Sequence, residues 1–288
     1  MPTIEVEKGV EIYYEEFGSG DRCLLCTQVA HGRFTLEREL AKRGFHVFLL
    51  TNRGFGRSTH VTEDYGEHWY DRFADDVAAF ADKMGIRRFV YSGASHGAGA
   101  GWHVVLRHPE RVICFFAVVP GPHNLDEGSR SIRTLAAEGK IKLPVMRLPS
   151  DDPRIRERYT LEDAAGRAQR AEPDYEQVYN SPETQAIDYG RPLAALRTEA
   201  NVQEALKTIR TPVLIIGGME DPISRPDLML RTAACLPNCK LIIYSGVSHA
   251  LPMVEDAADD AVRFYENLEN TGYYYSPIVN DGVLPVRP

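Results

Sequence analysis

The chain has 288 residues, a length that suits one large α/β domain or one domain with a sizeable insertion. Its formal net charge is −8, from 33 basic and 41 acidic side chains, which argues against nucleic acid or an anionic membrane as partner. No apolar run is long enough to span a bilayer, and Met1–Glu7 lacks the basic start and apolar stretch of a signal peptide. We therefore expect a cytoplasmic protein.

The five cysteines do not form a recognisable metal or disulfide pattern. Cys23 and Cys26 have C-x-x-C spacing, but they lie in an apolar segment typical of a buried strand. Cys235 and Cys239 lack the spacing of a second metal-ligand pair. We therefore expect reduced, at least partly buried thiols and no metal site.

Short apolar strands alternate with segments of helical periodicity, a pattern typical of a mostly parallel sheet covered by helices. The two N-terminal strands are expected to pair antiparallel. In chain order, the first part of the sequence predicts strands over residues 3–7, 11–17 and 23–27, a helix over 34–42, a strand over 46–50, a helix over 70–84, a strand over 88–91, a helix over 95–107 and a strand over 112–119.

The composition changes after residue 120, where charged residues, Pro and Gly become frequent and no convincing strand follows until about residue 210. We interpret residues 122–207 as a helical cap inserted into an α/β core formed by residues 1–121 and 208–288. The Tyr-rich tail after residue 272 is apolar enough to pack on the body or on a second subunit, which leaves a homodimer open. Weak helical patterns recur over 129–138, 161–171, 184–187 and 201–207; beyond the cap, the sequence predicts strands over 212–216 and 240–244 and helices over 226–236 and 255–268.

The segment Gly93-Ala94-Ser95-His96-Gly97 fits the pattern G-x-S-x-G. An apolar strand precedes it and a helix of small residues follows, the arrangement that presents a serine hydroxyl at the top of a sheet. The glycines avoid clashes in a strained backbone, and the helix N-terminus offers N–H groups to an oxyanion. We therefore predict that Ser95 is a catalytic nucleophile.

A serine hydroxyl needs a base that takes its proton, and chains with this turn order the residues Ser, Asp or Glu, then His. Of nine histidines, only His249 lies in a glycine-containing loop between the last strand and the final helix. Asp221 follows the preceding strand, where a carboxylate can hold the imidazole in the required tautomer. We predict His249 as base and Asp221 as orienting acid, with Glu220 and Asp126 as alternatives for the acid.

Three segments together, residues 93–97, 217–223 and 246–249, resemble the α/β-hydrolase superfamily, in its lidded branch of esterases, lactonases, carbon–carbon bond hydrolases and haloperoxidase-like proteins. Residues 52–58 resemble the R-G-x-G-x-S turn that follows the family's fourth strand. The resemblance covers about residues 8–120 and 208–268. It implies an α/β fold with a mostly parallel central sheet, flanked by helices and carrying a variable helical cap at the insertion.

The resemblance also implies an oxyanion hole made by two backbone N–H groups. One belongs to His96, directly after the nucleophile. The family carries His-Gly after its third strand, where this chain aligns Thr27-Gln28, and by that alignment Val29 gives the second N–H. The nearby His31-Gly32 pair either restores the motif through a shifted loop or has no role. The His96 side chain either contacts substrate or packs under the cap.

Relatives that open epoxides or displace halide use an aspartate as nucleophile, so Ser95 argues against both reactions. We expect an acyl-enzyme that water hydrolyses, with no metal or organic cofactor. The first hypothesis is hydrolysis of an ester or lactone bond in a small, mostly apolar molecule. Cap residues that suit an apolar pocket are Leu143, Val145, Met146, Leu148, Tyr159, Tyr175 and Tyr179.

Two alternatives remain. A carbon–carbon bond hydrolase of aromatic catabolism shares the three catalytic residues but needs groups that bind an acidic substrate. Arg147, Arg154 and Arg191 are candidates for such groups, or they are solvated surface charges. The other alternative is a ligand receptor of the same fold with residual turnover.

Overall fold

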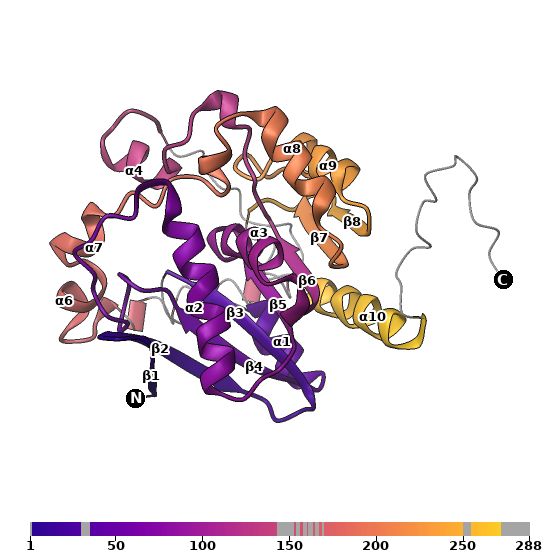
Figure 1. Ribbon diagram of the computed structural model, residues 1–288, viewed down its shortest axis with the longest axis horizontal. Helices are drawn as coiled ribbons and strands as arrows, with labels where there is room; N and C mark the ends of the chain where they lie inside the picture. Colours follow the sequence, from indigo (N-terminus) through magenta and orange to yellow (C-terminus); the bar gives the residue numbers. More distant parts are fainter. Residues whose placement is uncertain are drawn as a thin grey trace.

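A single eight-stranded sheet runs through the part of the chain that the structure describes (Figure 1). This computed structural model describes residues 2–29, 35–142, single positions between 153 and 170, 171–249 and 255–271. The strands are β1 (Thr3–Glu7), β2 (Val10–Phe17), β3 (Arg22–Gln28), β4 (Phe45–Thr51), β5 (Phe89–Ala94), β6 (Val112–Val118), β7 (Val213–Gly218) and β8 (Cys239–Tyr244). Their order across the sheet is β1-β2-β4-β3-β5-β6-β7-β8.

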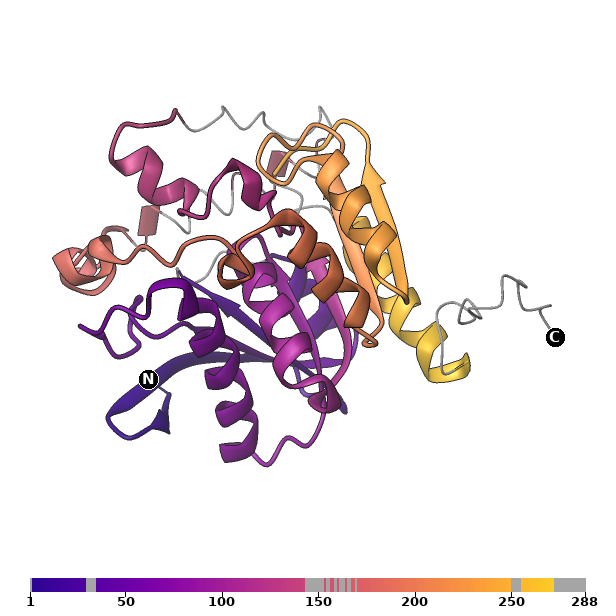
Figure 2. The ribbon, with the colours of Figure 1, turned by 45° about the horizontal axis from the view of Figure 1, so that its top comes forward.

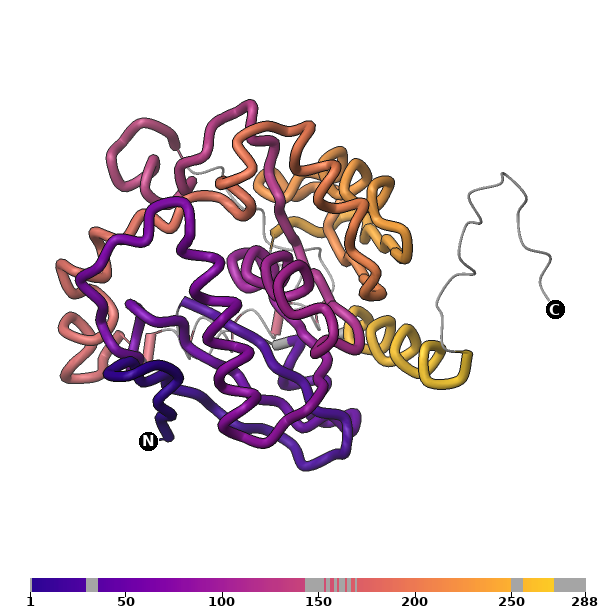
Figure 3. The backbone as a smooth tube through the Cα atoms, viewed as in Figure 1, coloured from indigo at the N-terminus to yellow at the C-terminus, as the bar shows by residue number. Residues whose placement is uncertain are grey.

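The sheet is antiparallel at one edge and parallel over the rest. The pairs β1–β2 and β2–β4 are antiparallel, as predicted for the N-terminal strands, whereas all pairs from β4 to β8 are parallel. In Figure 3 the indigo N-terminal hairpin and the orange β7–β8 region lie on opposite sides of the molecule. The carboxyl ends of the parallel strands therefore lie at the same end of the sheet. The loops at this end form the binding sites of α/β sheets.

Helices cover both faces of the sheet, which is why its central strands are apolar on both sides. On one face, α1 and α10 pack together over β4, β6 and β7. On the other face, α2 and α3 pack on each other and α3 lies against β5, while α9 contacts β7 and β8 (Figure 1). These helices are α1 (Thr35–Lys42), α2 (Trp69–Lys83), α3 (His96–Arg107), α8 (Glu199–Thr208), α9 (Pro226–Cys235) and α10 (Glu255–Thr271).

The predicted R-G turn after β4 is a structural junction. Arg53 donates from Nε and Nη2 to the two carboxylate oxygens of Asp76 in α2, at 2.8 and 2.5 Å, and Nη2 also meets Glu7 at 2.8 Å. The Ser58 hydroxyl donates to the Thr51 carbonyl and accepts from the N–H of Tyr13. The turn thus ties β1, β2, β4 and α2 together.

Between β6 and β7 the described residues contain short helices and no strand, in keeping with the composition. These are α4 (Ile132–Ala137), α6 (Tyr175–Tyr179) and α7 (Pro182–Ala186), followed by the ten-residue α8, with 3-10 turns at Leu125–Glu127 and Ala194–Leu196. Two further 3-10 turns, Gly66–His68 and Pro109–Arg111, lie earlier in the chain. Figure 2 shows α4 and the 171–190 stretch outside the helix–sheet layers. The division into core and cap stays a prediction, and the following predicted residues lie outside the described ones: His31, Gly32, Leu143, Val145, Met146, Arg147, Leu148, Arg154, Tyr159 and the tail after residue 272.

Two predicted elements differ in extent. The strand expected over 88–91 continues to Ala94, because Gly93 and Ala94 pair with Ala117 and Val118 of β6. The helix expected over 129–138 is confined to Ile132–Ala137. Within the described residues no helix has the length and apolar character needed to cross a membrane.

Candidate active site

Ser95 lies at the junction between β5 and α3. Its backbone has φ 51° and ψ −108°, a region that residues with a side chain rarely occupy. The Ser95 N–H donates to the Val118 carbonyl of β6 at 2.9 Å, and its own carbonyl accepts from Gly99 one turn into α3. The strained turn therefore directs the Ser95 hydroxyl away from the strand, at the shared carboxyl edge of β5 and β6.

Glycines on both sides of Ser95 make this turn sterically possible. A Cβ on Gly93 would collide with the backbone of Gly97, and a Cβ on Gly97 would collide with the Thr27 carbonyl oxygen of β3. Both glycines are therefore required by close backbone approach, and α3 begins directly above the ends of β3 and β5.

His249 brings the Ser95 hydroxyl and the Asp221 carboxylate into one hydrogen-bonded chain. Its Nε2 lies 2.9 Å from Ser95 Oγ, and its Nδ1 lies 2.8 Å from Asp221 Oδ2. The other oxygen of Asp221 accepts the N–H groups of Ile223 at 2.8 Å and Ser224 at 2.9 Å. The Asp221 side chain is fully buried, and that of His249 is 13% exposed, so the carboxylate is fixed while the imidazole stays accessible.

The two alternative acids lie elsewhere. Glu220 and Asp126 are both exposed, and the hydrogen bond to His249 is made by Asp221. An Asp126 oxygen instead accepts the N–H of Glu199 at the start of α8. Of the three acids considered from the sequence, the geometry brings only Asp221 to the imidazole.

The two residues predicted to bind an oxyanion sit on either side of the Ser95 turn. His96 is the first residue of α3, so its N–H belongs to the helix start, where amides lack an intrahelical partner. Val29 follows the end of β3, and β3 pairs in parallel with β5. The backbone segments of His96 and Val29 therefore both follow the carboxyl ends of parallel strands, at the same end of the sheet as Ser95.

The His96 ring is enclosed by aromatic side chains. Ring centroids of Tyr70, Phe73 and Tyr189 lie 5.2, 5.4 and 4.4 Å from the imidazole, and neither ring nitrogen has a hydrogen-bond partner among the described residues. Burial, with a smaller contribution from the charge of Arg133, lowers the pKa of His96 to about 3. The side chain is therefore neutral at physiological pH, packs among aromatic groups and also lines the cavity at Ser95.

A cavity of about 550 Å³ opens at the Ser95–His249 pair, and we call it the Ser95 cavity. Residues of the segment between β6 and β7 contribute much of its described wall, including Ile132, Tyr189 and Pro192. Such a volume suits a small molecule. Of the predicted apolar lining residues, Tyr175 and Tyr179 are described, and neither lines this cavity.

Arg191 and His123 line the Ser95 cavity as well. Arg191 is one of the three arginines predicted for the cap, whereas His123 was not predicted, because a lone histidine shortly after a strand carries no pattern of its own. Burial, and then the charge of Arg191, lower the pKa of His123 to about 4, so this imidazole is also neutral. The cavity therefore joins the Ser95–His249 pair to polar groups from a distant part of the chain.

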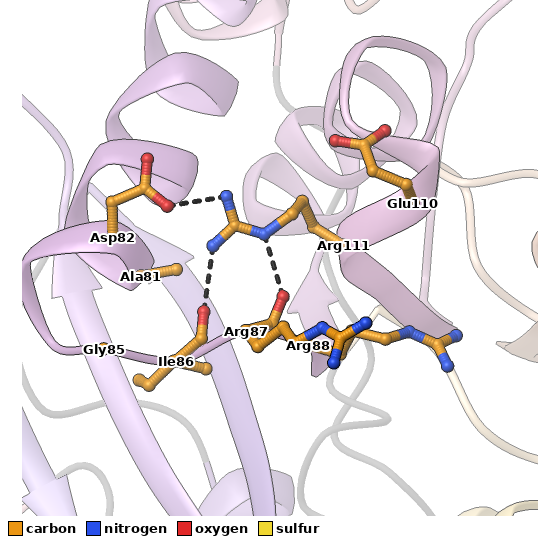
Figure 4. A pocket seen from close by; sticks show the side chains of 8 residues that line it. All are labelled: Ala81, Asp82, Gly85, Ile86, Arg87, Arg88, Glu110 and Arg111. Atoms are coloured by element: carbon orange, nitrogen blue, oxygen red, sulfur yellow. Dashed lines mark hydrogen bonds and ion pairs between the residues drawn. The ribbon is translucent and has the colours of Figure 1, made fainter.

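A second cavity, of about 380 Å³, lies away from this edge, between the end of α2 and the start of β6 (Figure 4). There Arg111 contacts Asp82 and donates to the carbonyls of Ile86 and Arg87. Its described lining residues include no nucleophile–base pair. No group of three His, Cys, Asp or Glu suited to hold a metal occurs among the described residues.

The fold and this site define the class of protein. The family model described as alpha/beta hydrolase fold matches residues 29–256, and the chain belongs to this family.

Similar proteins include several kinds of hydrolase. A bifunctional esterase/perhydrolase of Acinetobacter calcoaceticus is 26% identical, over 88% of this chain and 95% of that protein. The structure of a meta-cleavage product hydrolase from Pseudomonas fluorescens superposes with a TM-score of 0.62 at 18% identity, covering 94% of this chain and 96% of that chain. The structure of an N-acyl homoserine lactone degrading enzyme has a TM-score of 0.57 at 23% identity, covering 94% of this chain and all of that chain.

Proposed function

We propose that the protein is a serine hydrolase that cleaves an ester or lactone bond of a small molecule through an acyl-enzyme on Ser95. The observation that carries the proposal is the continuous hydrogen-bonded chain from Ser95 Oγ through His249 to the buried carboxylate of Asp221. The esterase named among the relatives supports the same reaction class. Fold likeness to the solved structures adds nothing about the bond that is cleaved.

In the acylation step, Ser95 Oγ attacks the substrate carbonyl carbon while His249 Nε2 takes the hydroxyl proton. The Asp221 carboxylate accepts the hydrogen bond of Nδ1–H, remains ionised and stabilises the imidazolium that forms. The negative charge on the carbonyl oxygen meets the N–H groups of His96 and Val29. The tetrahedral species collapses, the bond to the leaving alkoxide breaks, and the imidazolium gives it the proton.

In the second step, water attacks the acyl carbon and passes a proton to His249, and Ser95 leaves with that proton as the acid is released. The His249 imidazole is partly exposed to the Ser95 cavity, so water can reach it through this cavity.

A carbon–carbon bond hydrolase is a second candidate, because Arg191 lines the Ser95 cavity and such enzymes need a group that binds an acidic substrate. It uses the same nucleophile and base. A panel of esters, lactones and vinylogous diketones, assayed with the wild type and with Ser95→Ala, separates the two reaction types.

The direct test of the nucleophile is p-nitrophenyl acetate hydrolysis by Ser95→Ala and His249→Gln, with His68→Gln as a matched control at a histidine whose side chain is 65% exposed. Loss of turnover is expected in the first two variants and retention in the third, with unchanged circular dichroism in all. Full activity of a folded Ser95→Ala protein would refute the assignment.

A further inference from the structure

The charge of the Ser95 cavity differs from the charge of the whole chain. The protein carries eight more acidic than basic side chains, yet the charged side chains among the described lining residues are Arg133 and Arg191, with no Asp or Glu. A concave site lined by one sign of charge concentrates ligands of the other sign. The cavity wall therefore points to an anionic ligand in spite of the negative protein.

Arg191 is the more buried of the two cations, with 8% of its surface exposed. Its Nη1 donates to the Asn124 carbonyl at 3.0 Å and its Nε to the Arg130 carbonyl at 3.3 Å. These acceptors are neutral, and within the described ranges Arg191 makes no ion pair. A guanidinium buried with only neutral partners is costly, and burial lowers the pKa of Arg191 accordingly.

Two nearby arginines outside the cavity wall, Arg130 and Arg225, do have counter-charges. Arg130 pairs with Glu138 and Asp188, and Arg225 pairs with Glu127 and Asp227. Two described acids are engaged elsewhere. Glu127, whose charge acts on Arg191, pairs with Arg225. Asp188, three residues earlier in the chain, pairs with Arg130 and accepts the N–H groups of Ser131 and Gly190. Among the described residues, Arg191 therefore lacks the carboxylate that Arg130 and Arg225 have.

The Arg191 segment is also held rigidly beside the nucleophile helix. The Leu193 N–H donates to His103 Nε2 in α3 at 3.0 Å, while Nδ1 of that ring bonds Asp71 in α2. Pro192 packs so closely on α3 that a Cβ on Gly99, four residues after Ser95, would collide with it. The guanidinium therefore has a fixed place in the wall of the cavity that contains Ser95.

From this arrangement we infer that the natural substrate carries a carboxylate, which pairs with Arg191 when its scissile carbonyl reaches Ser95. A carboxylate supplies the planar acceptor that a guanidinium prefers, and it would provide the counter-charge that Arg191 lacks among the described residues. Half-buried Arg133, from α4, adds positive potential to the same wall. The inference rests on the proposed serine hydrolase function and narrows its small-molecule substrate to one that carries a carboxylate, in place of the mostly apolar molecule expected from the sequence.

The test compares two esters that differ in one charge and one methyl group, p-nitrophenyl hydrogen glutarate and its neutral methyl ester, after subtraction of the rate without enzyme. We expect the wild type to prefer the anionic ester. Arg191→Gln should lose about 10- to 100-fold in kcat/KM on that ester, the range of a charge-assisted hydrogen bond, with little change on the neutral one. Arg191→Lys keeps the charge and should retain part of the preference, and Arg225→Gln, at a cation that already has its carboxylates, should leave it unchanged.

A binding measurement separates the two proposals. Titration calorimetry of glutarate with Ser95→Ala needs no turnover, and binding that disappears in the Ser95→Ala/Arg191→Gln double variant supports the anion site even if neither ester is hydrolysed. Equal hydrolysis of both esters, dependent on Ser95, overturns the inference and leaves the hydrolase intact. An equal loss on both esters in Arg191→Gln shows a purely structural role and also overturns it.

Discussion

At the scale of single residues, the site depends on how Asp221 is held. One carboxylate oxygen accepts two backbone N–H groups from its own turn, so the other is aimed at His249 Nδ1. The Asp-x-Ile-Ser turn thus orients a buried charge before any substrate arrives. The adjacent Glu220 is exposed and lacks this geometry.

Asp221→Asn should lower kcat for p-nitrophenyl acetate by about 10⁴-fold, because an amide favours the wrong imidazole tautomer. Glu220→Gln is the matched control and should keep its activity. Steady-state kinetics of both variants decide the assignment, and a damaging Glu220→Gln or Asp126→Asn with a normal Asp221→Asn would reverse it.

Protonation of His96 should make stability depend on pH. The folded pKa of about 3 lies below the ordinary value of 6.5, so the folded state keeps a neutral ring while the unfolded chain takes up a proton as pH falls. Stability from this group is complete above pH 6.5 and is lost progressively below it.

Between pH 7 and pH 5 the wild type should therefore lose about 2 kcal/mol more unfolding free energy than His96→Gln, since each unit of unequal protonation corresponds to about 1.4 kcal/mol. Urea denaturation of both proteins at the two pH values measures the difference. Equal losses of unfolding free energy in the two proteins would mean that His96 binds its proton as well in the folded state as in the unfolded chain.

At the scale of elements, the turn after β4 shows how a motif joins distant parts of the chain. Arg53 is 3% exposed in its side chain and pairs with Asp76, which is 5% exposed. Removing the guanidinium leaves a buried carboxylate uncompensated. The motif that the sequence predicted as a family turn therefore acts here on stability, at a distance from the nucleophile.

Arg53→Leu should lower the unfolding free energy by about 3–5 kcal/mol, the cost of breaking a buried pair by removing one partner. Arg107→Leu is the control, because its pair with Asp75 is 40% and 35% exposed and should contribute about 1 kcal/mol or less. Urea denaturation compares the two. Equal losses would show that burial does not govern the energetics of these pairs.

The elements of the core follow from sequence because their patterns are strong. The continuous apolar runs of β3, β4 and β6 and the helical spacing of Tyr70, Phe73 and Val77 in α2 agree with the burial of these residues. Of the described helices between β6 and β7, α4, α6 and α7 are five or six residues long, too short for a periodicity to develop, and α6 was not predicted at all. Their position is set by contacts such as Thr184 with the Gly54 carbonyl, which no local pattern encodes.

At the scale of the whole molecule, the sequence predicts the reacting groups of the site but not the residues that line its cavity. Ser95, Asp221 and His249 occupy loops whose place follows from strand order, so motif and topology were enough to bring them together. Arg191 and His123 enter the same cavity through long-range packing. The composition does not predict the charge of this cavity. The net charge of the chain is −8, whereas the described charged side chains that line the cavity are arginines.

The measurement that tests the central claim most directly is covalent trapping of the nucleophile. The wild type and Ser95→Ala are incubated with a fluorophosphonate, followed by intact mass spectrometry and peptide mapping. A single adduct on the peptide that contains Ser95, absent from the folded variant, is the predicted result. An adduct on another residue, or equal labelling of Ser95→Ala, would contradict the proposal that Ser95 is the residue that attacks the substrate.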